Sequence, residues 1–300
     1  MKSTRESDND RLKGRSISFD EPLFFMEAHD GLSALIAEHT GFKAIWASGL
    51  SISTALGRRD ASEICPAEML RVFERIAEVT TVPVLVDADS GYGNFNNARL
   101  AARKLAQYSI SGMCIEDKLH PKMNSFVGSG QALADAQEFC GKIKAIRDQG
   151  LGNFAVVART EALISGLGMG EALDRAAAYL DAGADAILIH SKRPDANEIF
   201  EFLRQWEGRC PVVVVPTTYY QTPASELIRA GARGVIWANH SIRASVAAMK
   251  KACESIREQG GVQHLESNVE SLGGLFKLLD YDELASAEKR YLPPMGGVRA

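Results

Sequence analysis

Carboxylates, an arginine and a histidine recur in this sequence at the ends of short apolar runs. Each lies at or just after the end of such a run, in the order Asp87, Asp89, Glu116, Arg159 and His190. If the runs are parallel strands of one sheet, their carboxyl ends share an edge, and α/β proteins build active sites there. The pattern therefore predicts a charged site assembled from several strands.

The carboxylates of this set indicate a metal site. Asp87 and Asp89 are two positions apart, so on a strand their side chains point to the same face. Glu116 from the next run would bring a third carboxylate near the same point, which is unfavourable unless a cation neutralises it. Oxygen ligands suit Mg²⁺ or Mn²⁺, so we predict a Mg²⁺ site with Asp87 as direct ligand and the others acting largely through water. The alternative is that these carboxylates cap loops or pair with Lys118 and Arg159.

Arg159 and His190 lie on the side of the predicted site where a substrate anion would balance the metal. Arginine offers a planar fork to carboxylate or phosphate, and histidine can donate a hydrogen bond to developing negative charge. We interpret both as functional groups of the site. Asn239 and His240, which end the last apolar run, are interpreted as hydrogen-bonding groups that finish a strand.

The segment EDKLHPKMNS (residues 116–125) leaves an apolar run directly into a dense set of charges. It is either a solvated turn or part of a site that handles a highly charged small molecule. Charged loops are common, so by itself the segment favours the solvated turn.

Eight apolar runs organise the chain, each followed by a longer stretch that is helical in spacing. They cover residues 24–28, 44–49, 82–89, 112–117, 154–160, 186–191, 211–217 and 234–239. Continuous apolar strands separated by helices are typical of parallel sheets buried on both faces. Eight such units predict an α/β protein with the (β/α)8 TIM-barrel fold.

The two ends of the chain differ from this pattern. Residues 1–15 mix charges of both signs with few apolar residues, which predicts a flexible tail. Residues 16–300 are predicted to form a single barrel domain that includes the C-terminal helices. Helical stretches at 241–259 and 272–292 exceed what barrel closure needs, and we expect them to pack on a partner subunit.

Composition excludes several classes of protein. The chain has 300 residues, 46% hydrophobic and 24% charged, with a net charge of −4 and no basic stripe, so nucleic-acid binding has no support. Five widely spaced cysteines without a CxxC motif argue against a disulfide framework or a zinc site. No run approaches the roughly 18 apolar residues of a membrane span, and the first residues lack a signal-peptide pattern. We expect a cytoplasmic protein.

Several segments resemble the phosphoenolpyruvate mutase branch of the isocitrate lyase superfamily. They are MEAHDGLSA (26–34), GFKAIWASGLSIS (41–53), DADSGYGNFNNAR (87–99), EDKLHPKMNS (116–125), ARTEALISG (158–166), ADAILIHSK (184–192) and VIWANHSIRAS (235–245). EDK followed five residues later by NS is typical of the mutases within this superfamily.

The resemblance implies a Mg²⁺-dependent barrel whose extra C-terminal helix is swapped between subunits of a homotetramer, a dimer of dimers. It implies an isomerase that interconverts phosphoenolpyruvate and 3-phosphonopyruvate, the step that forms the C–P bond in phosphonate biosynthesis. Because equilibrium favours phosphoenolpyruvate, forward flux would need a downstream partner such as a phosphonopyruvate decarboxylase.

The resemblance also implies roles for individual residues. Asp87 would hold the metal, with Asp60, Asp89 and Glu116 acting largely through its waters. The pyruvyl carboxylate would meet Ser48, Gly49 and Leu50, with Trp46 nearby, while Arg159 and His190 would face the phosphoryl group. Lys122, Asn124 and Ser125 belong to a loop, residues 117–133, called the lid below. The lid would close over the substrate, and the run Gly128-Ser129-Gly130 would give it a flexible end.

Three other functions compete with the mutase. A phosphonopyruvate hydrolase shares the fold and metal site, but its lid asparagine is typically replaced by threonine, so Asn124 favours the mutase. A C–C lyase acting on 2-methylisocitrate or isocitrate carries a lid cysteine, and residues 116–134 contain none. A non-catalytic binder of a pyruvate-like anion would have lost a carboxylate or the lid lysine, Lys122. His120, Met123 and Phe126 depart from the usual lid residues and put the packing of the lid in question.

Overall fold

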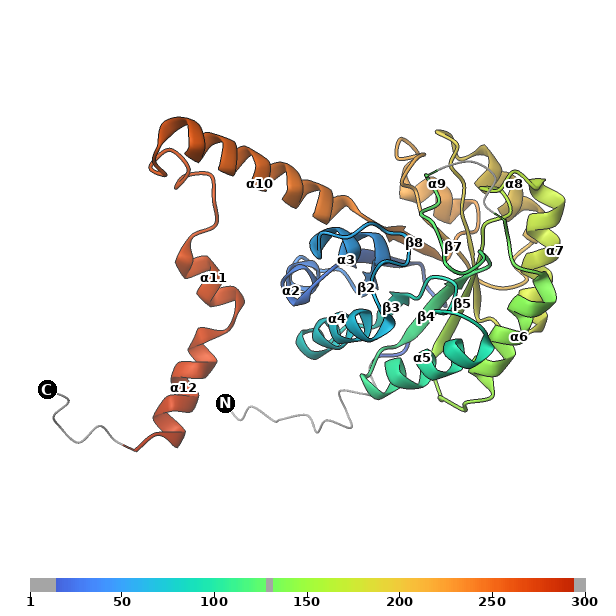
Figure 1. Ribbon diagram of the computed structural model, residues 1–300, viewed down its shortest axis with the longest axis horizontal. Helices are drawn as coiled ribbons and strands as arrows, with labels where there is room; N and C mark the ends of the chain where they lie inside the picture. Colours follow the sequence, from blue (N-terminus) through green and yellow to red (C-terminus); the bar gives the residue numbers. More distant parts are fainter. Residues whose placement is uncertain (1–14, 128–131, 294–300) are drawn as a thin grey trace, which may run out of the picture. The chain divides into compact units, whose positions relative to one another are not determined.

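A computed structural model describes residues 15–127 and 132–293 of the chain. The predicted flexible tail therefore lies, apart from Arg15, outside the described residues, as does the run Gly128-Ser129-Gly130. The chain divides into two compact units, residues 1–243 and 244–300, which are described separately (Figure 1).

The first unit is a closed barrel of eight parallel strands in sequential order, with β1 paired to both β2 and β8. The strands are β1 (Leu23–Ala28), β2 (Ala44–Ala47), β3 (Val84–Asp87), β4 (Gly112–Glu116), β5 (Ala155–Thr160), β6 (Ala186–Ile189), β7 (Val212–Val214) and β8 (Gly234–Trp237). Each overlaps one of the eight apolar runs. The predicted barrel is confirmed.

Helices connect the strands and surround the barrel (Figure 1). They are α2 (Gly31–His39), α3 (Gly49–Ala55), α4 (Pro66–Val79), α5 (Phe95–Gln107), α6 (Ala136–Arg147), α7 (Gly168–Asp181), α8 (Asn197–Trp206) and α9 (Ala224–Arg229). Several begin at a residue whose side chain accepts from the first-turn N–H groups, as Asn94 does for α5. Such caps set where the loops before α2, α3, α5 and α6 become helix.

Two apolar layers hold the barrel together. Inward-facing side chains such as Phe25, Trp46, Leu85 and Leu188 fill its interior, and a larger cluster packs the strands against the helices. A filled interior means that a ligand can bind only at an end of the barrel.

The second unit contains most of α10 (His240–Gln259), then α11 (Leu272–Leu278) and α12 (Tyr281–Tyr291). Within the described residues, α11 and α12 contain no buried side chain, and α10 buries only Ile242. The predicted helical stretches are thus present, while their exchange between subunits remains a prediction. No helix in the described part of the chain is long and apolar enough to cross a membrane.

Candidate active site

A cavity lies at the carboxyl ends of the strands. Most of the residues predicted to form the site line it. They are Trp46, Ser48, Leu50, Asp60, Asp87, Glu116, Lys122, Asn124, Ser125, Arg159 and His190, joined by Phe126, Val215, Thr217, Ala238 and Asn239. Gly49 and Asp89 complete the predicted set and lie directly behind this lining, beside Asp87.

The two aspartates after β3 come together in a different way from the one predicted. Strand β3 ends at Asp87, and Asp89 has a left-handed backbone (φ +49°), so the two side chains do not share a strand face. They meet instead beside Gly49, where an added Cβ would lie 3.2 Å from Asp87 Oδ2 and 3.4 Å from Asp89 Oδ1. The Gly49 N–H also donates to Asp87 Oδ2 at 3.2 Å. Glycine at position 49 therefore makes room for two carboxylates against the backbone.

Glu116 does not join this pair. Its Oε2 lies 3.3 Å from Arg159 Nε, and its Oε1 lies 4.0 Å from Lys118 Nζ. Within residues 15–127 and 132–293, no three Asp, Glu, His or Cys side chains converge as ligands of one metal ion. The predicted convergence of three carboxylates on one point is wrong, because basic side chains draw Glu116 away from the aspartates.

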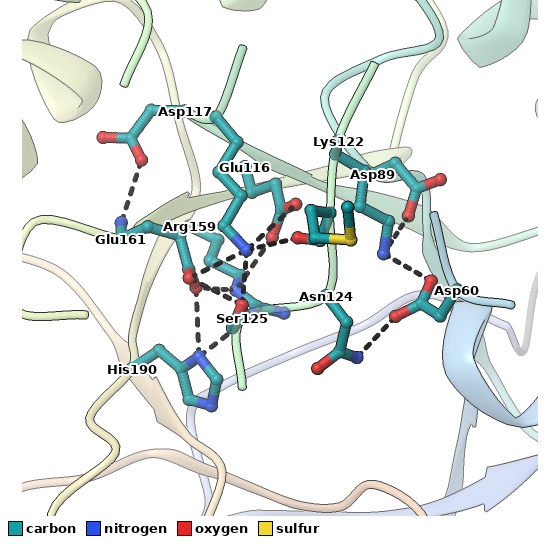
Figure 2. A network of polar contacts seen from close by, with 12 residues as sticks. Asp60, Asp89, Glu116, Asp117, Lys122, Asn124, Ser125, Arg159, Glu161 and His190 are labelled. Carbon is teal, nitrogen blue, oxygen red and sulfur yellow. Dashed lines mark hydrogen bonds and ion pairs between the residues drawn. The ribbon is translucent and has the colours of Figure 1, made fainter. Parts of the chain in front are cut away.

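The lid is bonded to Asp60, another residue that lines the cavity. Lys122 Nζ lies 2.6 Å from Asp60 Oδ1, and Asn124 Nδ2 donates to Asp60 Oδ2 at 2.6 Å (Figure 2). The Asn124 N–H donates to the Asp60 carbonyl at 3.1 Å. Lys122 Nζ also forms an ion pair with Asp89 Oδ1, 2.9 Å away. The angle at this contact is not that of a hydrogen bond. One aspartate thus holds two lid side chains over the cavity.

A second network lies at the ends of β4, β5 and β6 and centres on Glu161 (Figure 2). Its carboxylate accepts from Arg159 Nε at 2.5 Å and from Ser125 Oγ at 2.7 Å, and lies 3.0 Å from His190 Nδ1. Ser125 Oγ in turn accepts from Arg159 Nη2 at 3.0 Å and from Lys118 Nζ at 2.6 Å. Glu161 therefore fixes the positions of Arg159 and His190 relative to the lid.

Burial shifts the protonation equilibria of these groups in opposite directions. It raises the pKa of Asp89 to about 6 and that of Glu116 to about 7, because the nearby cations only partly compensate. Burial alone would also raise the pKa of Glu161, but the charge of Arg159, the hydrogen bond with His190 and the charge of Lys118 hold it well below its usual range. Burial and the charge of Arg159 lower the pKa of His190, so its imidazole is neutral at neutral pH.

Two residues that the structure places at the site, Glu161 and Phe126, have no predicted role in it. Glu161 lies two positions after Arg159, at the end of a predicted strand. This position is the one feature of the sequence that points to a place in the site. Phe126 lines the cavity and packs edge-on against the His190 ring, with centroids 5.5 Å apart. Asn239, interpreted as a strand-end group, also lines the cavity, and its Oδ1 accepts from Arg243 at 3.4 Å. No periodicity signals the contacts that join Glu161 and Phe126 to His190.

Comparison with known proteins identifies the family. The profile of the phosphoenolpyruvate phosphomutase family matches residues 15–257. The phosphoenolpyruvate phosphomutase of Tetrahymena pyriformis is 49% identical over 90% of this chain and 90% of its own. The chain belongs to the phosphoenolpyruvate phosphomutase family.

Solved structures agree with this assignment. The crystal structure of phosphoenolpyruvate phosphomutase from Streptomyces platensis subsp. rosaceus has a TM-score of 0.90 and 42% identity, and the match covers 92% of this chain and 97% of that one. A phosphonopyruvate hydrolase solved with oxalate and Mg²⁺ has a TM-score of 0.84 and 36% identity, over 91% and 95% of the chains. As a member of the phosphomutase family the protein is an enzyme, and its cavity is the candidate active site.

Proposed function

We propose that this enzyme interconverts phosphoenolpyruvate and 3-phosphonopyruvate. The observation that carries the proposal is the position of the lid, whose Lys122 and Asn124 bind Asp60 while Ser125 contacts Arg159. Lid residues and a cationic group suited to a phosphoryl anion thus line one cavity. In the reaction the phosphoryl group leaves the enol oxygen and bonds to C3 of the same molecule, so no co-reactant is needed.

The phosphoryl group would lie between Arg159, His190, Asn124 and Ser125. Loose phosphoryl transfer needs positioning and charge stabilisation more than covalent help. Arg159 lines the cavity and is held at Nε by Glu161 and Glu116 and at Nη2 by Ser125 and His190. The neutral His190 can donate from one ring nitrogen while the other accepts. Asn124 would orient the migrating group.

The pyruvyl part would lie toward β2 and β3. Ser48 and Leu50 line the cavity beside Asp87, and Trp46 forms part of its wall. The Ser48 N–H is bonded to the Ala28 carbonyl and the Gly49 N–H to Asp87 Oδ2, so the carboxylate would use the Leu50 N–H or the Ser48 hydroxyl.

The residues fit a divalent cation held mainly by Asp87. Carboxylate oxygens of Asp87 and Asp89 lie beside Gly49, and Asp89 Oδ1 is buried without a hydrogen-bond partner among the described residues. The same holds for Oε1 of Glu116, which lines the cavity but pairs with Arg159 and Lys118. One or two direct carboxylates with water in the remaining positions is the usual coordination of Mg²⁺. Asp60, Asp89 and Glu116 would act through such waters. When bound, Mg²⁺ would supply positive charge to a pyruvate enolate, and Mn²⁺ has the same preference for oxygen.

Keeping water away decides whether this site is a mutase or a hydrolase. Lys122 and Asn124 hold the lid against Asp60, and Phe126 covers the edge of His190. A closed cavity excludes the nucleophile that would otherwise capture the phosphoryl group.

The proposal extends to the oligomeric state of the enzyme and to its location in the cell. Helices α11 and α12 have no buried side chains, which supports packing on a second copy within a homotetramer, a dimer of dimers. The enzyme would work in the cytoplasm and supply phosphonopyruvate to a decarboxylase that removes the product.

The test is to incubate the purified protein with phosphonopyruvate, with Mg²⁺ or with EDTA, and to record phosphorus NMR spectra. We expect a phosphoenolpyruvate signal that requires Mg²⁺. Phosphate with pyruvate would instead establish a hydrolase, and an unchanged spectrum would overturn both. The Asn124→Thr variant should form phosphoenolpyruvate about 100-fold more slowly, because misplacing a substrate by about 1 Å has that cost.

A further inference from the structure

Behind the cavity, Asp117 forms a buried cluster with two residues of α7. Asp117 is fully buried and does not line the cavity. Its Oδ2 accepts from Tyr179 Oη at 2.7 Å and from Arg175 Nη1 at 3.2 Å. Its Oδ1 accepts from the Glu161 N–H at 2.8 Å. No part of the proposed mechanism uses this cluster.

The cluster holds both ends of the lid together. Asp117 is the first lid residue, and its carbonyl accepts from the Ala134 N–H at 2.8 Å, at the point where the chain returns toward α6. Arg175 Nη1 donates to the Ala134 carbonyl at 3.0 Å while it also contacts the Asp117 carboxylate. A guanidinium group on α7 therefore bridges the start and the end of the lid.

The same carboxylate is bonded to the residue that orients the phosphoryl-facing groups. The Asp117 side chain fixes the backbone of Glu161, and the Glu161 side chain contacts Arg159, His190 and Ser125. Asp117 itself is held at the end of β4 by its N–H, which donates to the Arg159 carbonyl at 3.1 Å. Lid and phosphoryl-facing groups thus share one anchor.

We propose that Asp117, Arg175 and Tyr179 are positioning residues that keep the lid in register with Arg159 and His190. The anchor decides how completely the closed cavity excludes water. Its effect on the ratio of phosphoenolpyruvate to phosphate rests on the proposed function. Loosening it lowers turnover and diverts the phosphoryl group to water, because the lid residues Asn124 and Ser125 are then no longer held in place against Arg159 and His190.

Two variants loosen the anchor with little loss of packing. Tyr179→Phe removes only the hydroxyl and leaves the ring against Phe139, 4.6 Å away between centroids. Arg175→Met removes the bridge. Arg147→Met is the matched control, because Arg147 likewise bridges two segments of the chain, through the carbonyls of Phe154 at 3.1 Å and Gly183 at 2.6 Å, but at the amino end of β5.

Turnover, KM, product ratio by phosphorus NMR, and unfolding in urea are measured for each variant. We expect Tyr179→Phe and Arg175→Met to lower kcat between about 10-fold and 100-fold, with little change in KM and more phosphate formed. Arg147→Met should lose stability yet keep the kcat and product ratio of the wild type. Wild-type kcat and product ratio in both anchor variants, or equal changes in Arg147→Met, would overturn the proposal.

Tryptic cleavage after Lys118 or Lys122 gives a readout that does not depend on activity. Both lysines are buried, and cleavage should accelerate in Arg175→Met but not in Arg147→Met. If the wild type converts no phosphonopyruvate, the proposed function fails, and the anchor is then judged by cleavage alone. Equal cleavage rates in the two arginine variants would overturn it.

Discussion

At the carboxyl ends of β4 and β5, the side chains of Glu116, Lys118 and Glu161 are each no more than 4% exposed. At the amino ends of the neighbouring strands, the ion pair of Arg147 with Asp185 is 29% and 44% exposed. Removing ions from water costs several kcal/mol for each ion, even after the surroundings relax. Among the residues that the structure describes, ion pairs buried to this extent lie at the carboxyl ends of the strands. The difference indicates that residues at the carboxyl ends serve a ligand, and residues at the amino ends serve stability.

The largest expected effect is on stability and comes from Glu161→Gln. The change removes one of the two buried carboxylates that face Arg159 and Lys118 and leaves only Glu116 beside them, and we expect the free energy of unfolding to fall by about 3–5 kcal/mol. Asp185→Asn at the other end should cost less than about 1 kcal/mol, because that pair is partly exposed. Urea unfolding measures both. Similar losses in the two variants would remove the contrast between the ends.

A smaller effect is expected from Gly112→Ala at the amino end of β4. The new Cβ would lie 2.6 Å from the Ala155 carbonyl oxygen, so the strands must shift, and overpacking of this kind costs about 1–3 kcal/mol. Turnover per folded molecule should not change.

Gly141→Ala in α6 is the control for this glycine, since no atom lies within 4 Å of the added Cβ. It should stabilise the protein by about 0.5–1 kcal/mol, the usual gain of alanine over glycine in a helix. A loss of turnover in Gly112→Ala, measured on folded protein, would contradict the inference that residues at the amino ends of the strands serve stability alone.

The smallest effect is a pH dependence at the carboxyl end of β1. His29 Nδ1 lies 2.6 Å from Glu27 Oε1, and Glu27 Oε2 accepts from the Ser241 and Ile242 N–H groups at the start of α10. Burial alone would lower the pKa of His29, but the hydrogen bond and charge of Glu27 outweigh it and raise the pKa.

A raised folded-state pKa means that the folded protein binds the proton more tightly than the unfolded chain. The resulting stability is fully present below about pH 6.5 and is lost as the pH rises through the folded-state value. His29→Gln should abolish this loss, as measured by urea unfolding between pH 6 and about 8. If the free energy of unfolding of the variant falls with pH as steeply as that of the wild type, His29 is not the source of the pH dependence.

The sequence alone determined the fold and most of the cavity lining. Eight apolar runs, each followed by a helical segment, specify a parallel barrel because every strand must bury both faces. That topology places Asp87, Glu116, Arg159 and His190 at one end, so their joint position in the cavity was predictable from where the runs stop.

Only the tertiary structure decided how those charges pair. The left-handed Asp89 and the space above Gly49 bring two aspartates together, while Arg159 and Lys118 draw Glu116 away. The anchor that joins Asp117 to Arg175 and Tyr179 links residues 58 and 62 positions apart. Local periodicity reports which face of a strand or helix is buried, but contacts between buried ions depend on side chains that meet only after the barrel closes.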